Sequence, residues 1–557
     1  MVEEWLARGD LPPGALWHNI IDTLHVCGCF DAEIDACRLM LALQPNQPFF
    51  QLRLIEMLRR SGKGDEARHV LAEMRGSDQD RAAALLEILN LEGEPLSAKA
   101  ALLDALEPLL LSDGEWSNRH LGLISHLVEM GVTERASNFF SRWTERWTIT
   151  SSHLADMGEA AMQLGRPDVA RSFFTPIWAR LSGGPTSAIP YFDGIIRPYD
   201  AAIEAALVER IDAAFALDEA ALPKMVPPDC HAPPPGIKVM MLTFDRYALP
   251  NDLAEHFGHT AAEAGIDFQI YFDRALTIPN DFQGDDDEVA RRVKMFADAL
   301  GRIRPDVLII DCVSHYVLRG LNPGVVAELK ARLGFRLVCI MRDAHDYVVR
   351  DLDRWLPVCD TMVVFDPLSP VLSPERAPLN RKVIALPVPS WHALFLERGE
   401  RDLGLTFVGS VKRLWRYMPL SVLMTEDIRF TAVFGPRRAV ETPDTRAYAR
   451  LLGRSRAVLN VSHHGNGVHL ITGRVWEAIA AGSLLVEQNN PATAMFFTPY
   501  RHYLPWTTVD DIIQIARFID RRPDLAARIA DEAHAWARRY YTGDRFWTAM
   551  LSHVTSG

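Results

Sequence analysis

Two hydrophobic periodicities divide the chain. In about the first 220 residues, apolar positions recur every three to four residues, as in LIEMLRRSGKGDEARHVLAEM, which predicts amphipathic helices joined by short turns. From residue 237 onward, short apolar and β-branched runs alternate with amphipathic segments of helical length. This alternation predicts parallel strands connected by helices, the pattern of doubly wound α/β sheets.

The strand-like runs form two series. The first lies between residues 237 and 398 and comprises IKVMMLTF, FQIYF, DVLIID, RLVCIM, TMVVF and KVIALP. The second begins at residue 403 and comprises LGLTFVGS, RFTAVFG, AVLNVS and SLLVEQ. Two such sheets in tandem form a cleft, and ligands of doubly wound domains bind at the carboxyl ends of the strands.

A proline-rich stretch separates the helical part from the α/β part. It holds six prolines between Pro223 and Pro235 (PKMVPPDCHAPPP), and proline continues neither a helix nor a strand ladder. We therefore expect a multidomain protein with four segments: a helical repeat domain at 1–222, a linker at 223–236, and two Rossmann-like domains at 237–398 and 399–557.

The helical part contains a degenerate internal repeat. The pattern G-x-x-x-x-A recurs with glycine spacings of 31, 38 and 34 residues at Gly62/Ala67, Gly93/Ala98, Gly131/Ala136 and Gly165/Ala170, after a degenerate copy at Gly28. A period near 34 residues resembles the tetratricopeptide repeat, a stacked helix-hairpin solenoid. The resemblance implies a concave surface that binds an extended peptide or a helix. The alternative is a generic helical bundle that only packs against the rest of the chain.

Composition narrows the class of protein. The chain has 557 residues and a net charge of −13, which disfavours a broad nucleic-acid footprint. The sequence lacks a secretory signal pattern and an apolar run of about 18 residues, so we expect a cytoplasmic protein with no integral membrane segment. Seven scattered cysteines are expected to be reduced thiols, and the lone C-x-C at Cys27 and Cys29 does not predict a metal site.

The segment TGRVWEAIAAGSLLV, residues 472–486, carries the strongest indication of a ligand site. Thr472 is expected to cap a helix, whose first-turn N–H groups, beginning at Gly473, would attract a phosphate. Arg474 adds a fork of donors, and Glu477 follows three residues later on the same helix face. Together they suit a pyrophosphate and a ribose. The alternative is an ordinary αβ unit in which the arginine pairs with the glutamate.

Polar or glycine residues also follow three other strands of the second series. Gly409 and Ser410 close FVGS, and Gly435 and Arg437 lie in FGPRR. A polar, glycine-bearing loop at 460–467 follows AVLNV. Because these strand ends meet at one edge of a parallel sheet, we expect them to contribute to the same site.

The order of these motifs, with Arg545-Phe546-Trp547 near the end, resembles the glycosyltransferases of GT-B fold, particularly the branch related to spore-maturation glycosyltransferases. The resemblance covers roughly residues 237–550 and implies a nucleotide-sugar donor on the C-terminal sheet. It implies that Glu477 holds the ribose, that Thr472, Gly473 and Arg474 hold the phosphates, and that Gly409 and Ser410 lie beside the leaving group. Where many retaining relatives carry a donor-sugar glutamate, this chain has His469.

Candidate acceptor-side residues follow RLVCIM in the first series. Asp343 and His345 would face the cleft, where a histidine beside carboxylates can act as a base or bind the donor sugar. Asp351 and Asp353 formally match a D-x-D metal signature, which we discount because the GT-B fold holds its diphosphate without a metal.

The leading hypothesis is a metal-independent GT-B glycosyltransferase that uses a nucleotide-sugar as co-substrate and no other cofactor. The repeat domain would present a protein or peptide acceptor, such as flagellin or another surface protein, by architectural analogy. One alternative is a nucleotide-sugar epimerase. Another is a non-catalytic scaffold, which His469 in place of glutamate favours. The sequence leaves open the donor base and sugar, the acceptor, the stereochemical outcome and the oligomeric state.

Overall fold

The computed structural model describes most of the chain beyond residue 29. The described residues are 17, 20, 21, 24, 30–89, 96–114, 116–147, 149, 153–182, 195–225, 236–243, 253–273, 276, 286–311, 321–342, 354–372, 379–411, 414–435, 442, 444–462 and 470–556. Several predicted site residues lie outside these ranges: Asp343, His345, Arg437 and His469.

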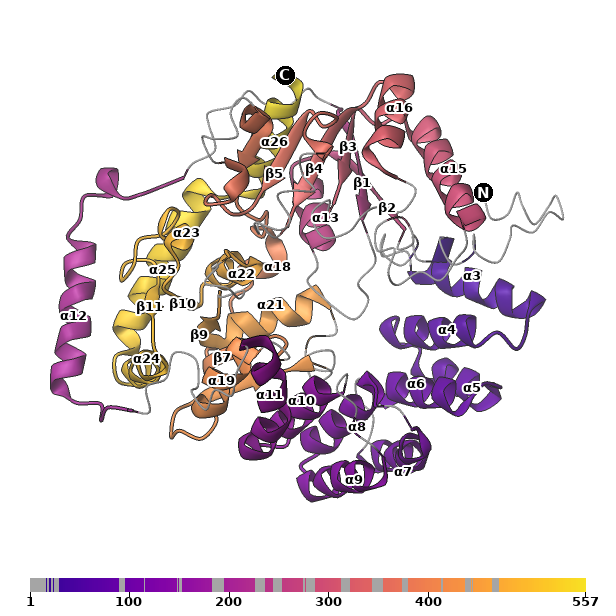
Figure 1. Ribbon diagram of the computed structural model, residues 1–557, viewed down its shortest axis with the longest axis horizontal. Helices are drawn as coiled ribbons and strands as arrows, with labels where there is room; N and C mark the ends of the chain where they lie inside the picture. The colour runs from indigo at the N-terminus through magenta and orange to yellow at the C-terminus, as the bar shows by residue number, and fades with distance from the viewer. Residues whose placement is uncertain are drawn as a thin grey trace. The chain divides into compact units, whose positions relative to one another are not determined.

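Helices joined by turns and short loops make up the described part of residues 30–182 (Figure 1). Their bounds are α3 (Phe30–Leu43), α4 (Pro48–Arg60), α5 (Gly64–Glu73), α6 (Asp78–Leu89), α7 (Leu96–Ser112), α8 (Asn118–Glu129), α9 (Thr133–Arg146), α10 (Leu154–Gln163) and α11 (Pro167–Ser182). Helices α4, α6 and α8 each contact the helix that follows and the second helix after it, and α10 contacts α8 and α11.

At three of its copies, the G-x-x-x-x-A pattern places a glycine in a turn between helices and an alanine in a helix contact. Gly62, Gly131 and Gly165 occupy the turns with φ values of +71°, +75° and +67°, a backbone conformation that favours glycine. The alanines five residues later are fully buried: Ala67, Ala136 and Ala170. The glycine makes each turn, and the small alanine lets the helices pack closely. A tetratricopeptide-like solenoid stays a prediction.

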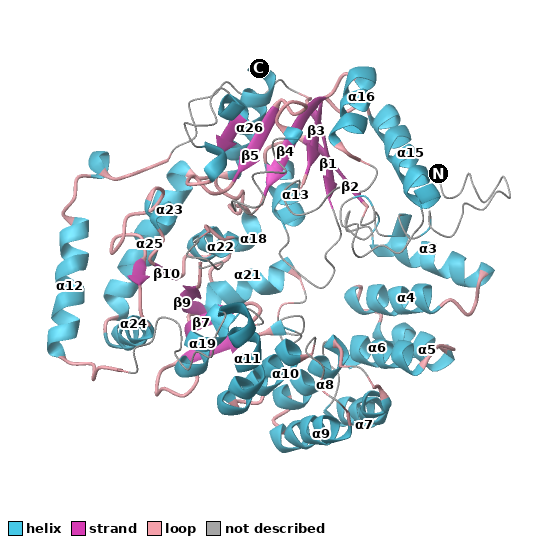
Figure 2. Cartoon of the chain, in the orientation of Figure 1, coloured by secondary structure: helices cyan, strands magenta, loops and turns pink. Residues whose placement is uncertain are grey.

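The first series of strands forms sheet A (Figure 2). Its order is β2-β1-β3-β4-β5-β6, and every neighbouring pair is parallel. The strands are β1 (Lys238–Thr243), β2 (Asp267–Phe272), β3 (Val307–Ile310), β4 (Arg336–Met341), β5 (Thr361–Val364) and β6 (Val383–Ala385). Phe296 from α15 (Asp286–Ile303) and Leu329 from α16 (Pro323–Leu333) belong to the same apolar core as these strands.

The second series forms sheet B, with the order β11-β10-β9-β7-β8. Its strands are β7 (Leu403–Val408), β8 (Phe430–Val433), β9 (Ser455–Asn460), β10 (Leu484–Gln488) and β11 (Leu504–Trp506). The pairs β7–β9, β9–β10 and β10–β11 are parallel. The predicted strands are thus confirmed as two α/β sheets, and β11 is added.

The C-terminal helix α26 (Gly543–Ser556) returns to sheet A, where it contacts β4, β5 and α13 (Leu253–Glu263). Trp547 donates its indole N–H to the Thr260 hydroxyl at 3.0 Å, and Phe546 packs edge-on against Phe257. Phe546 and Trp547 of the Arg545-Phe546-Trp547 motif therefore pack α26 against α13.

The chain divides into two compact units. Unit 1 comprises Met1–Pro190, Val408–Thr425 and Val433–Glu441, and unit 2 comprises Tyr191–Phe407, Glu426–Ala432 and Thr442–Gly557. Within unit 1, Tyr417 of α19 (Leu414–Leu423) donates to the Pro167 carbonyl at 2.9 Å and packs on Phe174. Segments that follow β7 and β8 thus join the helical part. The boundaries at residues 222, 236 and 398 stay predictions.

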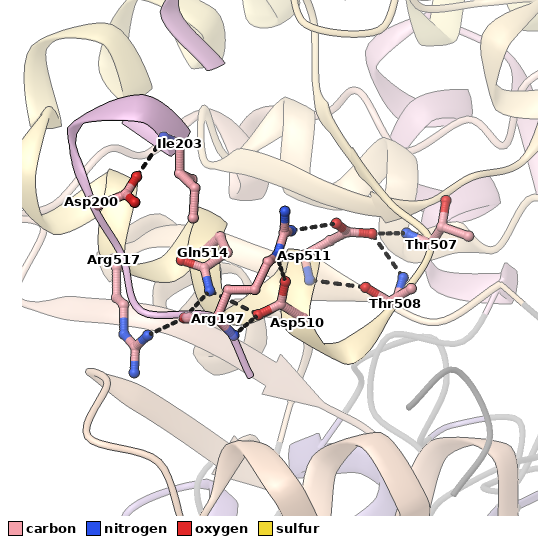
Figure 3. A network of polar contacts seen from close by, with 9 residues as sticks. All are labelled: Arg197, Asp200, Ile203, Thr507, Thr508, Asp510, Asp511, Gln514 and Arg517. Atoms are coloured by element: carbon pink, nitrogen blue, oxygen red, sulfur yellow. Dashed lines mark hydrogen bonds and ion pairs between the residues drawn. The ribbon is translucent and has the colours of Figure 1, made fainter. Parts of the chain in front are cut away.

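Residues 195–225, which we call the strap, lie within unit 2 along helices α24 (Val509–Arg521) and α25 (Pro523–Tyr540). Figure 3 shows Asp510 accepting from the Arg197 backbone N–H at 2.9 Å and from its guanidinium at 2.6 Å. Gln514 donates to Asp510 and to the Arg197 carbonyl. Helix α12 (Ala201–Phe215), which the predicted boundaries place in the repeat domain, belongs to the strap.

Two further expectations concern cysteines and membranes. The described cysteines are buried thiols: Cys37, Cys339 and Cys359. Among the helices of the described ranges, none is long and apolar enough to cross a membrane.

Candidate functional site

Helix α22 (Gly473–Ala480) follows the buried end of β9, as predicted, but its N-terminus differs from the expectation. Thr472 is the N-cap residue, yet its side chain makes no capping hydrogen bond. Its hydroxyl instead donates to the Asn460 side-chain oxygen at 3.0 Å. The predicted capping role of Thr472 is therefore wrong: the hydroxyl is turned toward the buried Asn460 amide at the end of β9, and its oxygen accepts no N–H group of the helix.

Asn460 organises the residues around this helix start. Its Oδ1 accepts from Thr472 and, at 3.0 Å, from the Arg474 guanidinium. Its Nδ2 donates to Glu487 at 2.7 Å, and its backbone carbonyl accepts from the Trp506 indole. Asn460 is fully buried. Since both the oxygen and the nitrogen of its side-chain amide are hydrogen-bonded, the orientation of Asn460 is fixed, and it fixes that of Arg474.

Glu487 of β10 forms the base of this network. Burial raises the pKa of Glu487 to about 7, although hydrogen bonds from Asn460, Thr493 and Asn490 act to lower it. Its other oxygen accepts from the Thr493 hydroxyl at 3.2 Å. The sequence placed Glu487 within an apolar strand, and only its occurrence in an otherwise aliphatic run indicated a special role.

Arg474 is half-buried and rests over the Phe407 ring, with its guanidinium carbon 5.2 Å from the ring centroid. An arginine held between an aromatic face and an amide oxygen is preorganised, since less side-chain entropy is lost when it binds an anion.

Glu477 is buried and accepts hydrogen bonds from two different elements. One oxygen lies 3.0 Å from Nε2 of His256 on α13, and the other accepts from the Tyr448 hydroxyl on α21 (Thr445–Arg454) at 2.7 Å. Burial would raise the pKa of Glu477, but these two hydrogen bonds, with the charges of His256 and Arg474, lower it below its usual value. The carboxylate is thus held ionised.

The Glu477 carboxylate also lies beside the first turn of its own helix. A Cβ added at Gly473 would come within 3.3 Å of the nearer carboxylate oxygen. The structure therefore brings together the helix start, Arg474 and Glu477 in one part of unit 2, and Asn460 joins Thr472 to Arg474 by hydrogen bonds.

Sequence reasoning missed the histidines behind Glu477. His256 Nδ1 lies 3.0 Å from Nε2 of His392, whose ring stacks on that of His259. Burial lowers the pKa of His392 to about 2, helped by the charges of His256 and His259, so His392 is neutral. The H-F-G-H sequence at 256–259 on an amphipathic helix was the available indication.

Three other predicted donor residues, Gly409, Ser410 and Gly435, lie in unit 1. Gly409 follows β7 and donates its N–H to the Val433 carbonyl at 3.0 Å, and Ser410 comes next in the chain. Gly435 follows β8 with a φ of +42°, and a Cβ there would come within 1.8 Å of the Glu159 carboxylate of α10. Gly435 thus has a packing reason to be glycine: it accommodates a side chain from the helical part.

The carboxyl edge of sheet A carries charged residues at successive strand ends. Asp311, which follows β3, is fully buried and accepts from the Thr243 hydroxyl at 2.6 Å and from Arg342 Nε at 2.8 Å. Arg342 directly precedes the predicted acceptor-side residues Asp343 and His345, which lie outside the described ranges. The side chains of the described residues include no group of three or more histidine, cysteine or acidic residues placed to hold a metal ion.

Residues 406–552 match the family model described as "Glycosyl transferase-like". This part of the chain is glycosyltransferase-like. The match runs from the end of β7 into α26 and includes Asn460, Arg474, Glu477 and Glu487. No curated protein matches the chain in sequence.

Similar solved structures include Anabaena HepE in complex with UDP and glucose, with 10% identity, a TM-score of 0.41, and coverage of 58% of this chain and all of HepE. A Rickettsia africae glycosyltransferase has 8% identity and a TM-score of 0.39 over 58% of this chain and 98% of its own. A Thermobaculum terrenum O-GlcNAc transferase has 14% identity and a TM-score of 0.35 over 96% and 95%. At these TM-scores the likeness assigns no function.

Proposed function

We propose that the chain is a glycosyltransferase that takes a nucleotide-sugar donor at the start of helix α22. The observation that carries the proposal is the arrangement within the glycosyltransferase-like segment. An arginine fixed by a buried amide and an ionised, buried glutamate lie beside the same helix N-terminus. A helix N-terminus with an arginine fork suits a diphosphate, and a carboxylate accepts hydrogen bonds from ribose hydroxyls.

The finer assignments belong to the same proposal. Gly409, Ser410, Gly435, Arg437 and His469 would contribute to the donor site, and Asp343 or His345 would act at the acceptor hydroxyl. Transfer would be metal-independent, because the helix N-terminus and Arg474 supply the positive charge that the diphosphate needs. A hexosyl group is the expected unit transferred, and the cytoplasm the expected location.

A protein or peptide is the proposed acceptor, bound by the helical part as a tetratricopeptide-like solenoid. Support comes from the paired helices, their glycine turns and the buried alanines. Glycosyl transfer needs the acceptor side chain held near the anomeric carbon, and a peptide-binding surface in the same chain would supply that positioning. The attachment of α11 to α19 within unit 1 would couple such a surface to the glycosyltransferase-like segment.

The first test is a thermal-shift titration of the full chain with UDP-, GDP-, CMP- and dTDP-sugars. A ligand at 100 times its dissociation constant adds about 2.7 kcal/mol of stability, which shifts the melting temperature measurably. A selective shift with one class of donor supports the proposal and names the base. The absence of a shift with every donor would favour a non-catalytic scaffold.

The acceptor is tested by incubating the full chain and the selected donor with candidate proteins, including flagellin. Mass spectrometry should then detect a gain of one glycosyl unit on a protein. Transfer only to free saccharides or lipid-linked acceptors would contradict the protein-acceptor part and leave the donor part intact.

A further inference from the structure

Two successive hydrogen bonds join three separated parts of the sequence: one between Glu477 and His256, and one between His256 and His392. Glu477 lies on α22 beside sheet B, His256 on α13 beside sheet A, and His392 just before α18 (Ala393–Leu396) in the segment between the two sheets. The successive distances are 3.0 Å from Glu477 to His256 and 3.0 Å from His256 to His392. All three side chains are buried.

The direction of the hydrogen bond follows from the charge state of Glu477. Because the carboxylate is ionised, it only accepts, so His256 donates to it through Nε2–H. His256 Nδ1 then faces His392 Nε2. Removing His256 would leave a buried carboxylate oxygen without this donor, and charged groups lose most from such a loss.

Helix α13 holds His256 firmly in place. Thr260, one turn later, donates to the His256 carbonyl at 2.7 Å and accepts from Trp547 of α26 at 3.0 Å. The Glu263 carboxylate accepts from the Ala393 backbone N–H at 2.8 Å, which ties the same helix to the segment that carries His392. The imidazole thus reaches Glu477 from a fixed support on the sheet A side.

We propose that His256 is a positioning residue for the donor site: it fixes the Glu477 carboxylate in the orientation that accepts hydrogen bonds from the ribose of a nucleoside diphosphate. The inference rests on the proposed function. It assigns to sheet A a part in donor binding, although the donor itself would lie on sheet B. Tyr448, the second partner of Glu477, acts on the other oxygen.

A pair of amide substitutions separates positioning of Glu477 from simple packing. The amide of His256→Gln lies where imidazole Nε2 lies and can still donate to Glu477, whereas the amide of His256→Asn lies nearer Nδ1 and cannot reach it. Both variants remove the imidazole ring and keep a side-chain amide, which differs only in its position. His256→Leu removes both hydrogen bonds, and the melting temperature of each unliganded variant reports on folding.

The experiment is calorimetric titration of the full chain and its variants with UDP, GDP and dTDP. For the diphosphate that binds the wild type, we expect His256→Gln to bind within about threefold of wild type. His256→Asn and His256→Leu should bind about tenfold or more weakly, the loss expected for one hydrogen bond to a charged group.

The outcomes are distinct. Equal affinities for the Gln and Asn variants, whether both unchanged or both weakened, would overturn the positioning role, because packing alone would then explain His256. If the wild type bound none of the diphosphates, the diphosphate site of the proposed function would fail and the inference with it. A Leu variant that does not fold leaves the Gln and Asn comparison decisive.

Discussion

The buried carboxylate of Glu487 predicts a measurable pH dependence of stability. The substitution is Glu487→Gln, which keeps the shape of the side chain and removes its ionisation. Glu487 is fully buried, and burial raises its pKa from 4.5 to about 7. Because the folded state holds the proton more tightly than the unfolded state, ionisation costs stability as pH rises through this interval, and the full cost is present above the folded pKa.

The magnitude follows from the two pKa values. Between about pH 5.5 and about pH 8.5, wild type should lose about 2 kcal/mol of unfolding free energy relative to Glu487→Gln. The loss corresponds to about 4 to 8 °C in melting temperature for a cooperative unit of roughly 150–250 residues. The glutamine can still accept from Asn460, so the network around Arg474 should persist.

The assay is thermal unfolding of the full chain and the variant at both pH values. Asp531→Asn, at an exposed carboxylate paired with Arg398, serves as a control because exposed ion pairs contribute little. Parallel pH dependence in wild type and Glu487→Gln would refute the reasoning, since Glu487 would then ionise at the same pH in the folded and unfolded states.

Two further predictions concern packing. Gly435→Ala should destabilise the chain by about 1–3 kcal/mol, because the alanine Cβ would overlap the Glu159 carboxylate. Adding Glu159→Ala in the same chain should restore part of this loss. If the two substitutions had additive effects on the free energy of unfolding in denaturation experiments, the contact would be contradicted. Asp510→Ala should lower the free energy of unfolding by about 1–3 kcal/mol and speed limited proteolysis within the strap, because Arg197 and Gln514 both lose their shared acceptor. Asp524→Asn serves as the control. A cleavage rate of Asp510→Ala equal to that of this control would show that other contacts hold the strap.

The regular elements could be predicted because their causes are local. Buried parallel strands such as VLII of β3 and the LLV that opens β10 are continuous apolar runs, and both sheets follow from such runs. The glycine turns of the helical part follow equally from short patterns. Strand β11 escaped prediction because its three residues include a proline and show no periodicity.

The candidate site could be predicted only in part, because its details depend on distant residues. The segment 472–477 was identified as a ligand site. The Thr472 hydroxyl, however, donates to Asn460, 12 positions earlier in the sequence, and does not cap its own helix. His256 lies 221 positions from Glu477 and 136 from His392, and nothing in a single sequence joins them. Gly435 was assigned to the donor site from its place at a strand end, and its contact with the distant Glu159 carboxylate could not be predicted.

The central claim, a nucleotide-sugar site at the start of α22, is tested most directly by the affinity of the donor for Arg474→Met. This residue is half-buried, and methionine can still rest on Phe407, so the fold should survive. The account predicts that calorimetric titration with the nucleotide-sugar selected by thermal shift shows affinity about tenfold or more below wild type, the loss expected for charge-assisted hydrogen bonds to a diphosphate. Equal affinity in a folded variant would place the donor elsewhere and contradict the account.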